Sequence, residues 1–108
     1  MARIVDETVI QEAADCLLKA APGSTIILFG SWARGDSKPD SDADFLVIEP
    51  EVNARRDEMV RLLDVLRPLR IPVDVVVASV DVFNKWSTIP GTIYHEAKQQ
   101  GRVLHATQ

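Results

Sequence analysis

The spacing of apolar residues predicts alternating helices and strands along the first half of the chain. In residues 5–19 the apolar positions recur every three or four residues, which is typical of a helix with one buried face. Pro22 and Gly23 are expected to end this helix. The β-branched and apolar run Thr25–Phe29 then predicts a short strand buried on both faces. A polar loop over residues 34–41 follows it.

The second half continues the alternation. Residues 43–48 predict a second strand that Pro50 stops, and residues 52–66 predict an amphipathic helix. A third strand is expected over residues 73–78. A short helix over residues 79–86, another over 91–100 and a small strand over 102–104 complete the chain.

Helix capping and fold class follow from this order. Ser79 is expected to cap the helix that follows it, and Gly101 to end the last one. The element order α-β-β-α-β-α-α predicts an α+β fold, with a short mixed sheet and helices packed on one face.

Length and composition narrow the class of protein. The chain has 108 residues, of which 46% are hydrophobic and 26% charged, so one globular domain over residues 1–108 is expected. Its apolar runs are too short to cross a bilayer, and residues 1–7 do not form a secretory signal. Cys16 is the only cysteine, which fits a reduced cytoplasmic location.

The charge balance argues against a basic nucleic-acid-binding surface. Sixteen acids against twelve bases give a net charge of −4, so direct binding of long nucleic acid is not expected. The acids are uneven, because residues 36–51 hold six of them and one base, Lys38. Such a segment is either a solvated loop or a place that holds cations.

Two of these acids form a D-x-D pair at the start of the second predicted strand. Asp42 and Asp44 are two residues apart, so in a strand their carboxylates point to the same face. A cation between them would relieve their repulsion, and paired oxygens suit Mg²⁺. A lone D-x-D is common, however, and usually binds no metal.

A third acid interrupts the third predicted strand. Asp74 stands inside the apolar run of residues 72–77, where a charge is costly unless it is paired or bound to metal. An edge-strand role that blocks aggregation is the simpler explanation for this residue alone. If the second and third strands are neighbours, Asp74 lies beside Asp42 and Asp44. Three such carboxylates can hold two divalent metals for displacement at phosphorus.

The turn after the first strand is a candidate phosphate-binding element. Gly30 lets the backbone approach a ligand closely, and Ser31 offers a hydroxyl and an N–H. If a helix begins there, its N-terminus favours anions. Arg34 could add a charge-assisted contact to the same phosphates. A glycine and a serine after a strand are otherwise an ordinary turn.

Together these residues resemble a known signature. Gly30-Ser31, ten further residues and then Asp42-Ala43-Asp44 is similar to the signature of the DNA polymerase β nucleotidyltransferase superfamily. Arg34-Gly35 and Ser41 also match its fuller form, and Asp74 matches the third carboxylate. The size resembles that of the minimal nucleotidyltransferases, small antitoxin partners of HEPN-domain toxins. Trp32 departs from the pattern, since many relatives have a polar or basic residue there.

The resemblance implies a role for each matched residue. Asp42, Asp44 and Asp74 would be the catalytic carboxylates and the ligands of two Mg²⁺ ions. Gly30 and Ser31 would grip the phosphates of ATP, with Arg34 and Ser41 also at the nucleotide. An acceptor hydroxyl would attack the α-phosphorus and expel pyrophosphate.

The resemblance also implies a partner. About thirty residues follow the third predicted strand, so the acceptor is expected on another polypeptide. In relatives of this kind it is a tyrosine of the HEPN toxin, and the two proteins form a hetero-oligomer. Transfer to a small-molecule hydroxyl, as in antibiotic nucleotidyltransferases, and neutralisation by binding alone are the two alternatives.

The remaining chemistry-bearing residues have simpler explanations. His95 and His105 have no motif around them. Cys16 lies next to the apolar stripe of the first helix and is expected to be a small buried hydrophobe. Arginines 55, 56 and 61 are expected on the solvated face of their helix, where Asp57 and Arg61 suit an i,i+4 pair.

Overall fold

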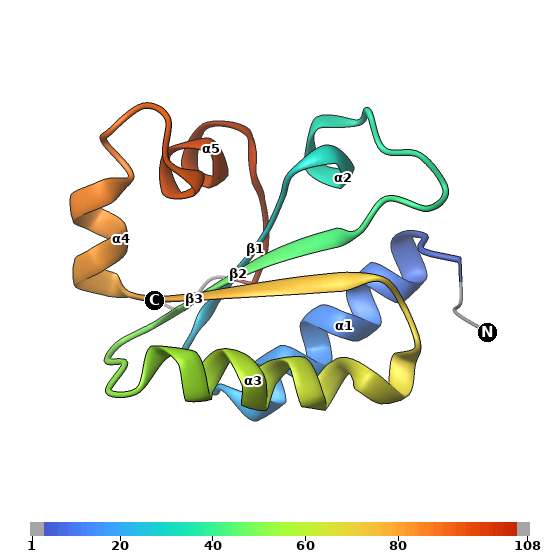
Figure 1. Ribbon diagram of the computed structural model, residues 1–108, viewed down its shortest axis with the longest axis horizontal. Helices are drawn as coiled ribbons and strands as arrows, with labels where there is room; N and C mark the ends of the chain where they lie inside the picture. The colour runs from blue at the N-terminus through green and yellow to red at the C-terminus, as the bar shows by residue number, and fades with distance from the viewer. Residues whose placement is uncertain (1–3, 106–108) are drawn as a thin grey trace.

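The computed structural model describes residues 4–105, so the ends of the predicted 1–108 domain lie outside the described residues. A four-stranded sheet crosses the middle of the molecule, with helices on either side of it (Figure 1). The elements in chain order are α1 (Glu7–Ala20), β1 (Thr25–Phe29), α2 (Ser31–Arg34), β2 (Ala43–Glu49), α3 (Arg55–Leu66), β3 (Val73–Ser79), α4 (Val80–Trp86), α5 (Ile93–Gln100) and β4 (Arg102–His105). A 3₁₀ turn, Arg67–Leu69, follows α3.

Side-chain caps explain where three helices begin. The carboxylate of Asp6 accepts a hydrogen bond from Val9 N at 2.9 Å, so α1 begins after Asp6 rather than at residue 5. The Ser79 hydroxyl accepts from Val82 N at 3.1 Å, which confirms the predicted cap of α4. The Thr92 hydroxyl caps α5 in the same way.

The start of α3 differs from the prediction. This helix begins at Arg55, whereas the sequence pattern predicted a helix from residue 52. Val52 lies in the preceding loop and packs against the core from there. Its apolar character therefore reflects burial of a loop residue and not the first turn of a helix.

The sheet has the strand order β3-β2-β1-β4. Strand β1 is antiparallel to both of its neighbours, β2 and β4. Strand β2 is parallel to β3, in a register that runs from the pair Ala43–Val73 to the pair Glu49–Ser79. The mixed sheet is confirmed, and so is the expected neighbourhood of the second and third strands.

The two faces of the sheet are covered by different helices. One face buries Leu28, Phe45 and Val77 in a large core shared with α1 and α3. The other face buries Leu46 and Ile48 in a smaller cluster, which Ala97 of α5 joins and on which Phe83 of α4 packs.

The prediction placed all helices on one face of the sheet. It is right for α1 and α3, whereas α4 and α5 pack on the other face. Strands β1 and β2 bury residues on both faces, and apolar side chains on a second face need a second covering layer. Asp44 lies on this second face together with Leu46 and Ile48, since strand residues two apart share a face.

None of the helices within residues 4–105 has the length and apolar character needed to span a membrane.

Candidate functional site

The sheet brings Asp44 and Asp74 together. They are direct register partners in the parallel pair of β2 and β3, so both side chains project from the same face. Asp42 lies immediately before β2, and its negative charge also acts on Asp44. The juxtaposition expected from the sequence is thus present at one edge of the second face.

Gly30 lies directly against this carboxylate group. Its φ of 75° is in the region that favours glycine. A Cβ built on Gly30 would overlap the Oδ2 atom of Asp44. The Gly30–Ser31 turn and the carboxylates therefore belong to one site, and Gly30 leaves the Asp44 carboxylate the space it occupies.

The electrostatics of Asp44 reflect its crowding by other acids. Burial, followed by the negative charges of Asp74, Asp42 and Glu96, raises the pKa of Asp44 to about 6, while Arg34 acts in the opposite direction. Three other carboxylates thus lie close enough for their charge to act on Asp44.

The chemistry of these carboxylates suits a hard divalent cation. Mg²⁺ takes oxygen ligands, commonly one or two carboxylates together with substrate phosphates. Within residues 4–105 no three Asp, Glu, His or Cys side chains already converge as ligands of one ion. Burial and repulsion by the neighbouring acids raise the pKa of Asp44, so a cation here would stabilise the charged carboxylates. Asp42, Asp44 and Asp74 are the residues that could hold it.

Arg34 ends the short helix α2 beside this group. Its guanidinium forms one ion pair with Asp36, Nε to Oδ2 at 3.2 Å, and another with Glu96, Nη1 to Oε2 at 3.3 Å. The next residue, Gly35, closes the helix in a left-handed conformation. The arginine predicted to meet phosphates thus lies at the site, and two carboxylates orient it.

Ser41 lies at the end of the polar loop and is hydrogen-bonded both to this loop and to α2. Its hydroxyl accepts a hydrogen bond from Lys38 N at 2.8 Å, and its carbonyl accepts one from Trp32 Nε1 at 3.0 Å. The tryptophan that departs from the family pattern therefore ties α2 to the residue just before Asp42. Ser41 has a structural role in holding the loop, whatever it adds at the nucleotide.

Glu96 is the site residue that the sequence did not reveal. It lies on α5, outside the matched motif, and its Oε2 accepts a hydrogen bond from Gly30 N at 3.2 Å. No local signal marks it, because its partners are more than sixty residues away in the chain.

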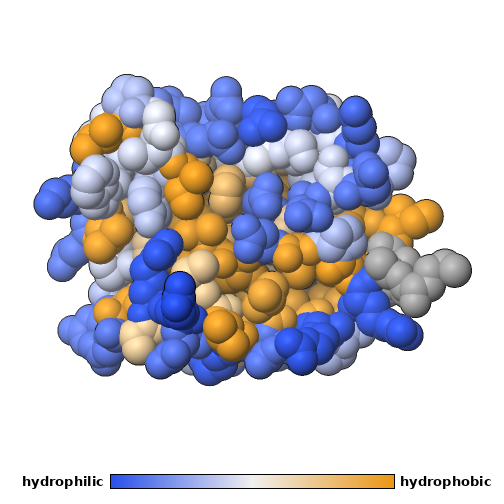
Figure 2. All heavy atoms as spheres, in the orientation of Figure 1, coloured by the Kyte–Doolittle hydropathy of each residue, from blue (hydrophilic) through white to orange (hydrophobic). Residues whose placement is uncertain are grey.

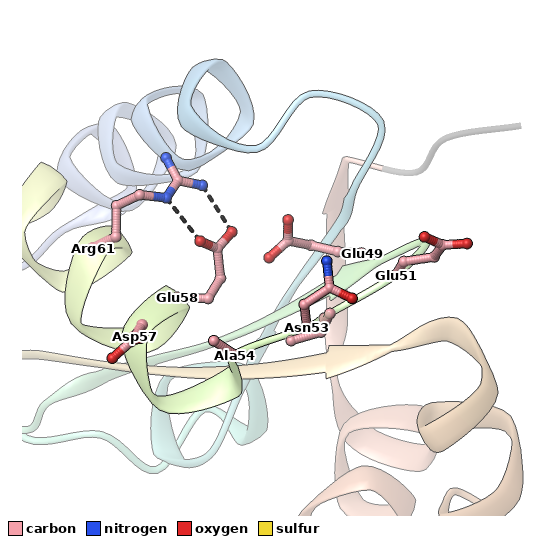
Figure 3. A pocket seen from close by; sticks show the side chains of 8 residues that line it. Glu49, Glu51, Asn53, Ala54, Asp57, Glu58 and Arg61 are labelled. Carbon is pink, nitrogen blue, oxygen red and sulfur yellow. Dashed lines mark hydrogen bonds and ion pairs between the residues drawn. The ribbon is translucent and has the colours of Figure 1, made fainter.

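A second group of acids lies at the opposite end of β2. Glu49, Glu51 and Glu58 line a cavity of about 320 Å³ beside the start of α3 (Figure 3). Both carboxylate oxygens of Glu58 accept hydrogen bonds from Arg61, each at 2.7 Å. Burial and the neighbouring Glu58 raise the pKa of Glu49 to about 7. This group shares no residue with the motif and is a feature of how α3 docks.

The other weak candidates take structural positions. Arg55 donates from Nε to the carbonyl of Val77 on β3 at 2.8 Å, so it is not simply solvated as expected. Arg61 pairs with Glu58 rather than with Asp57. Cys16 is half-buried against the large core, close to the prediction.

An apolar cavity of about 360 Å³ opens next to Asp74. It lies between α3 and the outer edge of β3 and is lined by Arg55, Arg56, Met59, Val60, Leu63, Asp74 and Val75. Apolar side chains gather over β3 and α3 on this face of the molecule (Figure 2). Val60 and Leu63 are 55% and 40% exposed. An apolar surface thus lies at the edge strand that carries Asp74, although the Asp74 side chain projects from the other face of the sheet.

Comparisons with known proteins agree with this geometry. A family model described as "Nucleotidyltransferase domain" matches residues 10–98. The chain is 31% identical over 103 residues to "Putative protein adenylyltransferase MJ0604" of Methanocaldococcus jannaschii, covering 93% of this chain and 98% of that protein.

Solved structures show the same fold. A toxin–antitoxin structure with AMP-PNP has a chain 25% identical to this one, with a TM-score of 0.53; the match covers 91% of this chain and 74% of that one. A chain in the structure of a tri-AMPylated HEPN toxin of Shewanella oneidensis in complex with MNT antitoxin is 22% identical, with a TM-score of 0.50, covering 95% of this chain and 75% of that chain. The second likeness is one of fold alone.

Proposed function

The chain belongs to the nucleotidyltransferase domain family, and on this premise we propose that it transfers AMP from ATP to a partner protein in a Mg²⁺-dependent reaction. The acceptor is a tyrosine hydroxyl of a HEPN toxin, and the chain acts as the antitoxin of that pair. The relative named for protein adenylyltransferase activity and the toxin–antitoxin structure with an ATP analogue support this assignment.

One arrangement carries the proposal. Asp44 lies between Asp74, its register partner on β3, and Gly30 at the end of β1. Carboxylates that could hold metal are thus next to a turn that could hold phosphate. A nucleotidyl transfer needs both within the length of one nucleoside triphosphate.

The carboxylates have distinct roles in this proposal. Asp42 and Asp44 would hold both Mg²⁺ ions, and Asp74 would complete the site nearer the acceptor. When bound, the ions supply positive charge that offsets the charge of the triphosphate. Asp74 would take the proton of the acceptor hydroxyl as its oxygen bonds to the α-phosphorus and the bond to pyrophosphate breaks.

The turn and the loop would hold the nucleotide. The Gly30 and Ser31 backbone approaches the β- and γ-phosphates, and Arg34 adds a charge-assisted contact. Ser41, already hydrogen-bonded within its loop, would lie along the nucleotide near Asp42. Catalysis by these groups is mostly a matter of positioning and charge.

The cavity beside Asp74 supports a protein acceptor with an aromatic hydroxyl. Its lining combines Met59, Val60 and Leu63 with two arginines. Apolar walls of this kind suit an aromatic ring of a docking protein, at the edge strand that carries Asp74. A highly polar acceptor would leave these apolar walls without a complementary partner.

The experiment is intact-mass spectrometry of the protein encoded next to this chain, after incubation with the chain, ATP and MgCl₂. An AMP adduct that is absent with the Asp42→Asn/Asp44→Asn double variant would support the proposal. No adduct with a folded chain, or turnover only with small hydroxyl compounds, would contradict it. Full neutralisation of the partner in cells by the double variant would show that binding alone suffices.

A further inference from the structure

Glu96 on α5 contacts two parts of the candidate site, the Gly30–Ser31 turn and Arg34. Helices α5 and α2 lie on either side of the end of β1 (Figure 1). A single oxygen atom, Glu96 Oε2, accepts from Gly30 N at 3.2 Å and pairs with Arg34 Nη1 at 3.3 Å. One carboxylate therefore contacts both groups proposed to meet the triphosphate.

The Gly30 N–H needs this partner because the sheet offers none on that side. Strand β4 pairs with β1 only at residues 26–28, so it ends before Gly30. Gly30 is itself buried. A buried backbone N–H without an acceptor is destabilising, so its acceptor fixes where the turn lies.

Arg34 is likewise held in one place by Glu96. Asp36 binds the guanidinium at Nε, and Glu96 binds it at Nη1. An arginine with two such partners loses little further freedom when it meets a phosphate.

From these contacts we infer that Glu96 is a positioning residue for nucleotide binding, which holds the Gly30–Ser31 turn and Arg34 in the arrangement that receives the triphosphate. The inference rests on the proposed function. It goes beyond it by assigning a role to a residue of α5, outside the motif.

Two substitutions separate the hydrogen bond from the charge. Glu96→Gln keeps an oxygen that can accept from Gly30 N but loses the ion pair with Arg34. Glu96→Ala loses both contacts. Gln99→Ala, at an exposed position of the same helix, is the matched control.

The first readout is hydrogen exchange of the Gly30 amide, followed by NMR without nucleotide or metal. Exchange should be at least about tenfold faster in Glu96→Ala than in the wild type, and remain slow in Glu96→Gln and Gln99→Ala. Equal exchange in all four proteins would show that the contact does not hold the turn, and would overturn the inference.

The second readout is the dissociation constant of AMP-PNP with Mg²⁺, which requires no acceptor. Glu96→Ala should weaken binding about tenfold, as expected for one charge-assisted hydrogen bond, and Glu96→Gln should weaken it less. Unchanged binding would mean a purely structural contact, and tighter binding would mean that Glu96 competes with phosphate; either overturns the inference. Failure of the wild type to bind AMP-PNP would overturn the proposed function. Binding by the wild type with unchanged binding by Glu96→Ala would overturn the inference alone.

Discussion

Gly30, which directly follows β1, and Asp44 of β2 are packed so closely that a Cβ on the glycine would overlap a carboxylate oxygen of the aspartate. The contact explains why a glycine stands at the start of the turn that we propose to bind phosphate. It also couples the position of that turn to the position of the carboxylates, so that a change at one is transmitted to the other.

Gly30→Ala should therefore damage activity more than an ordinary glycine substitution. The change adds a clash with Asp44 to the strain of a φ of 75°. We expect a loss of about 2–3 kcal/mol in the free energy of unfolding and of about 100-fold in AMP transfer.

Gly35→Ala is the control for this prediction. Gly35 has a similar φ of 85°, but nothing lies within 4 Å of its added Cβ. Gly35→Ala should lower the free energy of unfolding only by the backbone strain, about 1 kcal/mol, as measured by chemical denaturation. Equal losses in the two variants would show that the contact with Asp44 is unimportant.

Asp44→Asn should have opposite effects on stability and function. Removing one of several crowded charges should raise the free energy of unfolding of the metal-free protein by about 1 kcal/mol near pH 8, allowing for solvent screening. AMP transfer should fall by at least about 100-fold.

Mg²⁺ titrations followed by thermal unfolding add a third measurement. Mg²⁺ should raise the Tm of the wild type and leave that of Asp44→Asn unchanged, because a ligand stabilises only the state that binds it. Asp81→Asn, on α4, controls for the loss of one negative charge. A variant less stable than the wild type without metal would contradict the charge-crowding explanation.

The sequence predicted the strands well because they depend on local patterns. The bounds of β1 follow from its β-branched and apolar residues. The two-residue spacing predicted that Asp42 and Asp44 share a strand face, but Asp42 lies just before β2. That Asp74 lies beside Asp44 followed once β2 and β3 were assumed to be neighbours.

The rest depends on packing between distant segments. The sequence pattern placed Val52 in the helix because an apolar residue that packs on the core can belong to a loop as well as to a helix. The contact of Glu96 with Gly30 depends on where α5 lies across the second face of the sheet. No periodicity within α5 can predict that placement, because Glu96, its one acidic residue, would be equally stable exposed to solvent.

Leu63→Glu should impair transfer to the partner without impairing nucleotide binding. Leu63 is 40% exposed on the apolar surface near Asp74, and a charge there would be buried on docking. We expect at least a tenfold fall in the initial rate of AMP transfer to the partner, with the AMP-PNP dissociation constant unchanged.

Val103→Glu is the matched control for this surface. Val103 is 56% exposed on β4, at the opposite edge of the sheet from β3. Its substitution should leave transfer as in the wild type. If both variants were equally impaired, or neither, the acceptor would not dock beside Asp74.

Glu49 lies beside the Glu58 carboxylate, and its raised pKa favours a protonated Glu49, which needs no cation of its own. Glu49 Oε2 is buried, and within residues 4–105 no donor reaches it. Arg61 neutralises Glu58 and, with Glu49, lowers the pKa of Glu58 to about 2. A protonated Glu49 can donate to the Glu58 carboxylate, whereas a charged Glu49 would be repelled by it (Figure 3).

Glu49→Gln should therefore flatten the dependence of stability on pH. The folded-state pKa of Glu49 is raised from 4.5 to about 7, so the folded protein holds a proton that the unfolded chain has released. Its contribution to stability is complete below pH 4.5 and is lost as the pH rises through 7. Between about pH 5 and 8 the wild type should lose about 1 kcal/mol more than Glu49→Gln in urea unfolding, a value reduced by solvent screening. Glu51→Gln, in the same cavity, controls for net charge. Parallel pH curves for wild type and Glu49→Gln would show that the two glutamates share no proton.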